Sequence, residues 1–222
     1  MAKATRNHPA PLSAALDDLP PRRRAMLIAA FQVLMERGYA KASTLEIATR
    51  AKVSKRELYA EFGNKNGILQ ALIASTAEHM QTPLMPAEMG DRQAFTAALT
   101  AYGVAALGAL TSPVVLATNR LAIAEAPAVG ELGRILDESG RQPNRRALTK
   151  IMRRAQTAGL MGPGDPERIG GEFFSLLVGD LMMWLLMGVS APPDTAEIRT
   201  RAARAAEAVL TLHPVQGSRS DR

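Results

Sequence analysis

Two short segments of this 222-residue chain combine helix-start signals with side chains that can bind DNA. In the first, Ser43 is followed three residues later by Glu46, and in the second, Ser54 is followed in the same way by Glu57. In such a capping box the Ser hydroxyl accepts from a backbone amide, while the Glu reaches back to the amide of the Ser. The pattern predicts two short helices, and their separation is typical of a helix-turn-helix.

The second of these helices carries groups that can read a DNA sequence. Lys55 and Arg56 can donate to O6 and N7 of guanine, and Arg56 can do so with two parallel hydrogen bonds. The hydroxyls of Ser54 and Tyr59 suit phosphate oxygens, which fix the register of a protein on the duplex. Lys65, just beyond the helix, can pair with a further phosphate. Taken singly, each residue is better explained as a core or solvated residue, so the group of them carries the argument.

The positive charge of the chain is concentrated around these residues. Residues 1 to 66 contain twelve Lys and Arg against six Asp and Glu, whereas the rest of the chain contains fifteen of each. The first third therefore holds the whole net charge of +6. This asymmetry indicates a polyanionic partner, with a solvated basic face as the alternative.

Composition argues against several other kinds of site. The chain has no Cys, so disulfides and thiolate sites are excluded, and a reducing cytoplasm is the expected compartment. His8, His79 and His213 lie far apart, so we expect no metal site, and we expect no cofactor. No pairing of nucleophile and base and no phosphate-cradling glycine loop is recognisable, so an enzyme is not expected.

Helical periodicity runs through nearly the whole chain. Pro20 and Pro21 start a helix that Gly38 closes, and Pro83 follows a later one. The pattern predicts a short helix that begins at Ser43 and further helices over residues 21–37, 55–61, 65–81, 91–110, 113–125, 128–158 with a break near 140–143, 166–188 and 194–212. Strand signals are lacking, so the predicted fold class is all-α.

One apolar stretch, residues 173 to 189, has a membrane span as its alternative interpretation. It falls short of the roughly 20 residues that a span needs, and Asp180 lies near its middle. We therefore expect a buried helix and no membrane contact.

From Arg23 to Leu72 the chain resembles the N-terminal domain of the TetR family of transcriptional regulators. The motifs that carry the resemblance are Gly38-Tyr39, Ile47-Ala48, Val53-Ser54, Leu58-Tyr59, Phe62 and Lys65. The resemblance implies a DNA-binding module of three helices, a fourth helix that joins it to a ligand-binding domain, and a homodimer formed through the last two helices.

The resemblance also assigns roles to individual positions. It implies phosphate contacts by Ser43 or Thr44, Ser54, Tyr59 and Lys65, and base contacts by Lys55, Arg56 and Ala60. Lys52 stands where the family's turn normally has Gly, so either it adopts a left-handed conformation at a cost of about 1 kcal/mol or more, or the turn differs. Arg56 and Glu57 also depart from the family pattern, and Glu57 either caps the helix or reads cytosine.

The predicted organisation is an N-terminal three-helix helix-turn-helix domain followed by a larger C-terminal helical domain. We expect an arm over 1–19, a DNA-binding domain over 20–66 with its helix-turn-helix at about 43–62, an effector-binding and dimerisation domain over 67–213, and a tail over 214–222. Residues 120 to 188 resemble the C-terminal domain of the AefR-like subgroup, on the motifs Arg120-Leu121-Ala122-Ile123-Ala124-Glu125-Ala126-Pro127, Gly159-Leu160 and Asp165-Pro166.

The C-terminal domain is expected to dimerise and to bind an effector. The segment from Phe173 to Met187 is apolar on nearly all sides, so the helices over 166–188 and 194–212 suit a dimer face. The dimer would hold its recognition helices about 34 Å apart on a pseudo-palindromic operator. A pocket rich in Ala, Leu and Met favours an apolar or amphipathic effector, with candidate contacts at Tyr102, Asn119, Arg120 and Trp184. The expected function is a repressor that an effector releases; the alternative is a helical interaction protein that has lost DNA binding.

Overall fold

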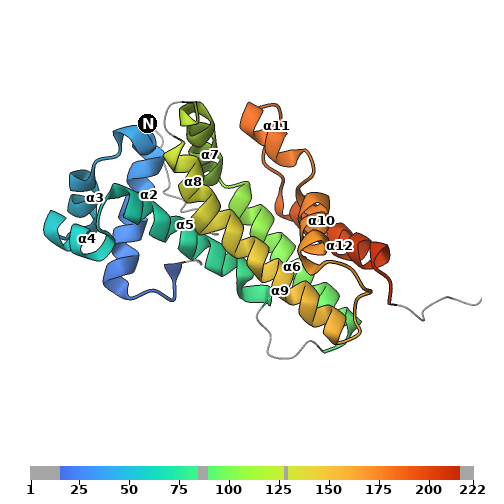
Figure 1. Cartoon of the computed structure of the whole chain (residues 1–222). Helices are drawn as coiled ribbons and strands as arrows, with labels where there is room; N and C mark the ends of the chain where they lie inside the picture. The colour runs from blue at the N-terminus through green and yellow to red at the C-terminus, as the bar shows by residue number, and fades with distance from the viewer. Residues whose placement is uncertain (1–15, 85–89, 128–129, 216–222) are drawn as a thin grey trace, which may run out of the picture.

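The computed structural model describes residues 16–84, 90–127 and 130–215, so most of the expected arm and tail lie outside the described residues. Within those ranges the chain forms helices and no strands, which confirms the all-α prediction. The helices, labelled as in Figure 1, are α2 (Pro21–Lys41), α3 (Thr44–Ala51), α4 (Lys55–Phe62), α5 (Lys65–Gln81), η1 (Thr82–Leu84), α6 (Arg92–Leu110), α7 (Pro113–Glu125), α8 (Glu131–Leu136), η2 (Asp137–Arg141), α9 (Gln142–Thr157), α10 (Pro166–Val178), α11 (Leu181–Met187) and α12 (Thr195–Leu212).

Helices α2, α3 and α4 gather at one end of the molecule, which we call the DNA module (Figure 1). Leu27, Ile47 and Leu58, one from each helix, are almost fully buried against one another. Leu16, which lies in the predicted arm, also belongs to this core, and Val114 joins it from α7. Burial of such side chains stabilises a fold by roughly 1.5–3 kcal/mol each, so the two short helices are held mainly by this shared core.

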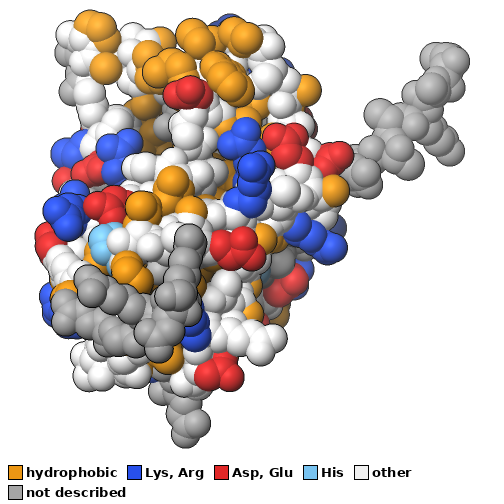
Figure 2. Space-filling view, turned by 90° about the vertical axis from the view of Figure 1, so that its right-hand side faces the viewer, with side chains coloured by type: hydrophobic (Ala, Val, Ile, Leu, Met, Phe, Trp, Pro, Cys, Tyr) orange, Lys and Arg blue, Asp and Glu red, His pale blue; other side chains and the backbone are white. Residues whose placement is uncertain are grey.

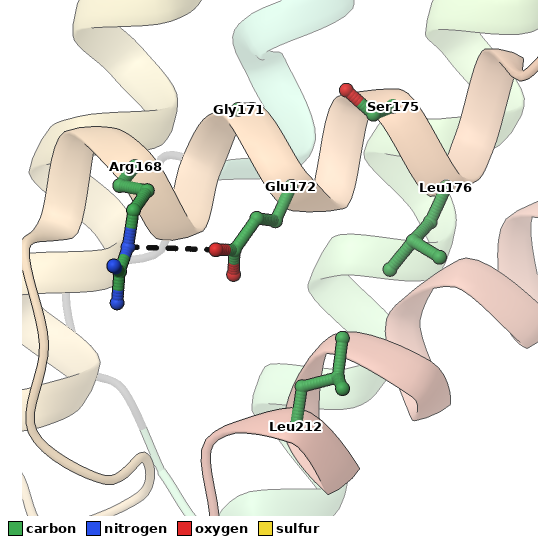
Figure 3. A pocket seen from close by; sticks show the side chains of 6 residues that line it. All are labelled: Arg168, Gly171, Glu172, Ser175, Leu176 and Leu212. Carbon is green, nitrogen blue, oxygen red and sulfur yellow. Dashed lines mark ion pairs between the residues drawn. The ribbon is translucent and has the colours of Figure 1, made fainter.

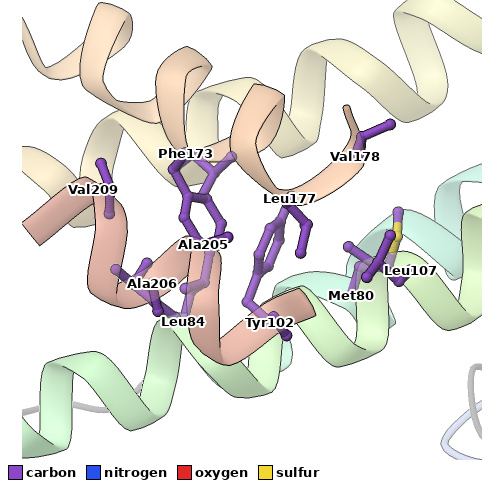
Figure 4. Packing of buried hydrophobic residues seen from close by; sticks show 14 of the residues in the cluster. Met80, Leu84, Tyr102, Leu107, Phe173, Leu177, Val178, Ala205, Ala206 and Val209 are labelled. Carbon is purple, nitrogen blue, oxygen red and sulfur yellow. The ribbon is translucent and has the colours of Figure 1, made fainter. Parts of the chain in front are cut away.

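Helices α6, α9, α10 and α12 form the larger part of the molecule, which we call the body. Tyr102, Phe173 and Leu177 lie in its core, where side chains from α6, α10 and α12 meet (Figure 4). At Gly103 the backbones of α6 and α12 pass so closely that a Cβ atom would lie 2.9 Å from the Cβ of Ala202. This contact between small residues fixes the separation of the two helices.

Helix α5 is shared between the DNA module and the body. Its first turns bury Ile68 and Leu72 in the module core, and its last turns bury Met80 in the body core. Between them, Leu69 packs with Leu132 of α8 in a third, smaller cluster. Because close-packed cores transmit displacements, any movement of α5 must alter its contacts in both parts.

Two of the predicted helices differ from the structure. No break occurs near residues 140–143; the chain continues from α8 to α9 through a π-helical turn, because the wider turn accommodates the ring of Pro143 without ending the helix. The predicted helix 166–188 is in fact α10 and α11, bent by 50°. The bend lies at Gly179, which ends α10. Its φ of 47° is in the left-handed region, which glycine adopts more readily than other residues.

The described residues include one helix, α6, that is long and apolar enough to cross a membrane, and the bent pair α10 and α11 passes the same test together. Core helices of soluble proteins also pass it. Phe95, Leu99 and Tyr102 of α6 are buried in the body core, which favours the interpretation as a core helix.

Candidate DNA-binding site

The first expected capping box does not form. The Ser43 hydroxyl accepts from the amide of Leu45 at 3.2 Å, so α3 does begin with a side-chain cap. Glu46 does not reach back to Ser43, because its carboxylate is bound by Arg50 and lies 3.7 Å from Arg37. This prediction of a full box at Ser43 was therefore wrong, since two nearby cations compete for the acid.

The second capping box is complete. The Ser54 hydroxyl accepts from the amide of Glu57 at 3.1 Å, and the Glu57 carboxylate accepts from the amide of Ser54 at 2.8 Å. Arg22 of α2 donates to the other oxygen of the same carboxylate. With both oxygens engaged inside the protein, Glu57 acts as a cap in this structure, the first of its two predicted alternatives.

The turn between α3 and α4 contains Lys52 in the left-handed conformation, with φ 55° and ψ 42°. The structure thus decides between the two alternatives for this position, in favour of a turn of the usual shape made without Gly. Its amide donates to Thr49, and the amide of Val53 donates to Ala48 at 3.0 Å, so the end of α3 keeps its hydrogen bonds.

The exposed face of α4 presents the predicted base contacts. Lys55, Arg56 and Ala60 are all exposed, and no ion pair of Arg56 is found among the described residues. The Nζ atom of Lys55 lies 5.3 Å from the ring centre of Tyr59. The hydroxyl of Tyr59 is 2.9 Å from that of Thr44, so a predicted phosphate contact on α3 and one on α4 lie side by side.

The acids of α4 point the other way, toward α2. Arg23 binds Glu61 and stacks over the ring of Phe62 at 5.0 Å, while Arg22 binds Glu57. These pairs neutralise the acids of the recognition helix, while Lys55 and Arg56 stay exposed on its outer face. The charge pattern therefore matches that of a surface that meets phosphates.

A chain of contacts not predicted from the sequence connects Lys65 to α8. Its Nζ atom lies 4.4 Å from the ring centre of Tyr39, whose hydroxyl donates to the side-chain oxygen of Asn66. The Asn66 amide nitrogen in turn donates to Glu131 of α8 at 2.7 Å. Tyr39 and Lys65 are separate motifs of the family resemblance, but no sequence pattern pairs them, and Glu131 is brought in by the tertiary fold.

The thermal stability of the DNA module is expected to depend on the ionisation of Glu57. Hydrogen bonds from the backbone and side chain of Ser54, then that from Arg22, hold the pKa of this carboxyl below its ordinary value of 4.5. A carboxyl whose pKa is lowered by folding stabilises the folded state at pH values above its ordinary pKa. This stabilisation is lost as the pH falls through the lowered pKa. The difference in melting temperature between the native protein and Glu57→Gln should therefore be constant near neutral pH and shrink below pH 4.5. A difference independent of pH would contradict the assignment of Glu57 as an ionised cap.

None of the four candidate effector contacts lines either of the two grooves described below. Tyr102 is buried in the body core, and its hydroxyl has no partner among the described residues. Asn119 donates to the Val115 carbonyl of its own helix at 2.8 Å. Arg120 donates to carbonyls at the end of α11, at 2.5 Å and 2.8 Å, and Trp184 on α11 is 44% exposed.

Two protein-family models match this chain, one in its N-terminal part and one in its C-terminal part. The family model for the AefR-like transcriptional repressor C-terminal domain matches residues 97–212, and that for the bacterial regulatory proteins of the tetR family matches residues 27–72. The chain belongs to the TetR family of transcriptional regulators. It is a DNA-binding protein of a family without enzymatic activity, and the matched N-terminal region contains the helix-turn-helix formed by α3 and α4.

Individual relatives of this TetR-family protein agree with that assignment. It is 35% identical over 71 residues to the uncharacterized HTH-type transcriptional regulator YvkB of Bacillus subtilis (strain 168); the match spans 32% of this chain and only 37% of that relative. A TetR regulator structure from Agrobacterium tumefaciens is 30% identical, with a TM-score of 0.74 over 89% of this chain and 97% of the other. The flavonoid-responsive regulator FrrA is 25% identical, with a TM-score of 0.64 over 88% of this chain and 98% of that one.

Proposed function

We propose that this regulator is a homodimeric repressor that binds a pseudo-palindromic operator and leaves it when a small apolar or amphipathic effector binds the body. The observation that carries the proposal is the exposed pair Lys55 and Arg56 on α4, next to acids that are tied to α2. In this proposal Lys55, Arg56 and Ala60 contact bases. Phosphates are bound by Ser43 or Thr44, Ser54, Tyr59 and Lys65. A cytoplasmic location follows from this role.

The proposed dimer face lies on α10, α11 and α12. Exposed apolar side chains concentrate there, including Leu176 at 44% and Leu212 at 60% exposure. In Figure 2 apolar side chains gather at the top of this side of the molecule, where α11 carries Met183, Trp184 and Met187, all exposed. Exposed apolar groups that gather in this way are typical of an interaction surface.

A shallow groove on this face supports the same proposal. It runs between α10 and α12, with Leu176 and Leu212 on its two sides and the ion pair of Arg168 and Glu172 at one end (Figure 3). Its exposed Gly171 leaves room for a side chain to approach the α10 backbone. We propose that a second copy of the chain fills this groove, and that Trp184 contacts the partner rather than an effector.

Sedimentation velocity tests the dimer and its link to DNA binding. The double variant Leu176→Glu with Leu212→Glu should be monomeric and lose most of its operator affinity, because burial of charge at the proposed interface is costly. Ile123→Glu is the matched control, since Ile123 is an exposed apolar residue of α7 at 62% exposure, outside the groove. A double variant that stays dimeric and binds DNA as before would exclude this face as the interface.

The proposed release by an effector is supported by the position of α5, which is packed into both cores. A ligand that moves the end of α5 in the body would also shift the beginning of α5, where Lys65 and the module core lie. FrrA, a relative with the same overall fold, is described as flavonoid-responsive, which supports a small-molecule signal for this chain too. Linkage requires that operator and effector weaken each other by the same factor. Equal operator affinity with and without a saturating compound would exclude that compound as an effector.

Tyr102→Phe is expected to raise the free energy of unfolding by about 1 kcal/mol, since a buried hydroxyl without a partner costs roughly 1–3 kcal/mol. Burial also raises the pKa of Tyr102 well above its ordinary range, so the group stays neutral at all working pH values. Chemical denaturation of the two proteins checks the expectation. Destabilisation by Tyr102→Phe would instead mean that the hydroxyl has a partner, such as a buried water. If the proposed effector uses this hydroxyl, the same variant should bind it more weakly.

A further inference from the structure

A second groove lies where the end of α5 and η1 meet α9. It has a volume of about 280 Å³, and its apolar lining includes Leu84, Ala147 and Ile151. Leu84 and Ile151 are also buried members of the body core. A molecule in this groove would therefore contact core side chains directly, with room for a body about the size of a fused pair of aromatic rings.

The rim of this groove is positively charged. Arg146, Lys150 and Arg154 follow one another at intervals of four residues, which places them in one row along α9, and no residue that lines the groove is acidic. Arg146 makes only a long contact of 3.5 Å to Gln142. Lys150 has no hydrogen bond or ion pair to any of the described residues. Like charges at this spacing repel each other, and a bound anion would remove that repulsion.

The basic residues on the other side of α9 do not line the groove. Arg145 points away from the groove and pairs with Glu167 of α10 at 3.1 Å. Arg153 is exposed and does not line the groove. A basic helix that is merely solvated has no concave apolar surface beside its charges. The groove is therefore distinguished by apolar side chains next to Lys and Arg, and not by charge alone.

We infer that this groove binds a small organic anion, with its apolar body on Leu84 and Ile151 and its charged group between Arg146 and Lys150. The inference rests on the proposed function in one respect, because it gives the effector its chemical class: an amphipathic carboxylate or similar anion. The groove is lined by Gln81 at the end of α5, and in Figure 1 this end of α5 lies away from α3 and α4, so the groove is separate from the DNA face. Its position at the end of α5 is one from which a ligand can act on the helix that carries Lys65.

Calorimetric titration of the full chain with matched probes tests the inference. The probes are 2-naphthoate and octanoate, each compared with its primary amide, which keeps the shape and removes the charge. The anions are expected to bind at least about tenfold more tightly than the amides, and this preference should weaken as salt rises. Arg146→Gln with Lys150→Gln should abolish the preference, whereas Arg153→Gln on the same helix should retain it.

Three results would overturn the inference: neither anion binds, the amides bind as tightly as the anions, or the double variant keeps the preference. Operator binding of the same preparations separates this inference from the proposed function. A protein that binds its operator but neither anion refutes only the groove. A folded protein that binds the anions through Arg146 and Lys150 but binds no operator supports the groove and refutes the proposed function.

Discussion

Gly67→Ala is expected to abolish operator binding and to destabilise the protein by about 3 kcal/mol or more. Gly67 lies in the first turn of α5, where its amide donates to the cap residue Asn64 at 2.9 Å. A Cβ atom at this position would lie only 1.9 Å from the carbonyl oxygen of Phe62, the last residue of α4. Because the clash is with backbone, it can be relieved only by moving the recognition helix away from α5.

Gly108→Ala is the matched control for this prediction. Gly108 lies inside α6, and a Cβ atom there would meet nothing within 4 Å. The same substitution should stabilise the protein by roughly 0.5–1 kcal/mol, since glycine in a helix interior is unfavourable. Denaturant unfolding and fluorescence anisotropy with operator DNA measure both effects. If Gly67→Ala folded with native stability and bound DNA normally, the docking of α4 on α5 described above would be wrong.

Arg56→Ala is expected to weaken operator binding by roughly 30-fold or more and to relax sequence preference at the contacted position. A bidentate contact from Arg to guanine contributes about 1–3 kcal/mol, and the proposed dimer makes it twice, so the loss is on the order of 2–6 kcal/mol. Fold stability should change little, because Arg56 is exposed and no ion pair of its side chain is found in the described part of the chain.

Arg141→Ala provides the control for charge alone. Arg141 is a solvent-exposed base of the π-helical turn η2, outside the DNA module. Its loss lowers the net charge by the same amount and should change affinity only slightly, through long-range electrostatics. Equal affinities of the two variants for operator DNA would mean that Arg56 reads no base.

The DNA module was largely predictable because its signals are local. The helix starts depend on Ser43, Ser54 and Asn64, which cap the helix that follows within three residues. Periodic apolar residues then predicted the presence of the helices that the structure shows as α2 to α5. The sequence also limited the backbone conformation at Lys52 to two alternatives. Choosing between them required the φ and ψ angles of the structure.

The rest of the candidate site depended on contacts between residues far apart in the chain. Glu46 forms no capping box because its carboxylate is bound by Arg50 and lies 3.7 Å from Arg37. The link from Asn66 to Glu131 joins residues 65 positions apart, which no periodicity can indicate. The bend at Gly179 was missed because an apolar run looks continuous whether or not one glycine in it is left-handed.

The central claim, that this chain is a sequence-specific DNA-binding regulator, is tested most directly by titrating the purified protein against labelled DNA. The DNA comes from upstream of its own gene, with a scrambled fragment as control, at two salt concentrations. We expect the native fragment to bind at least about a thousandfold more tightly than the control, and binding to weaken steeply with salt as phosphate contacts are lost. A folded dimer that binds neither fragment, even at low salt, would contradict the claim.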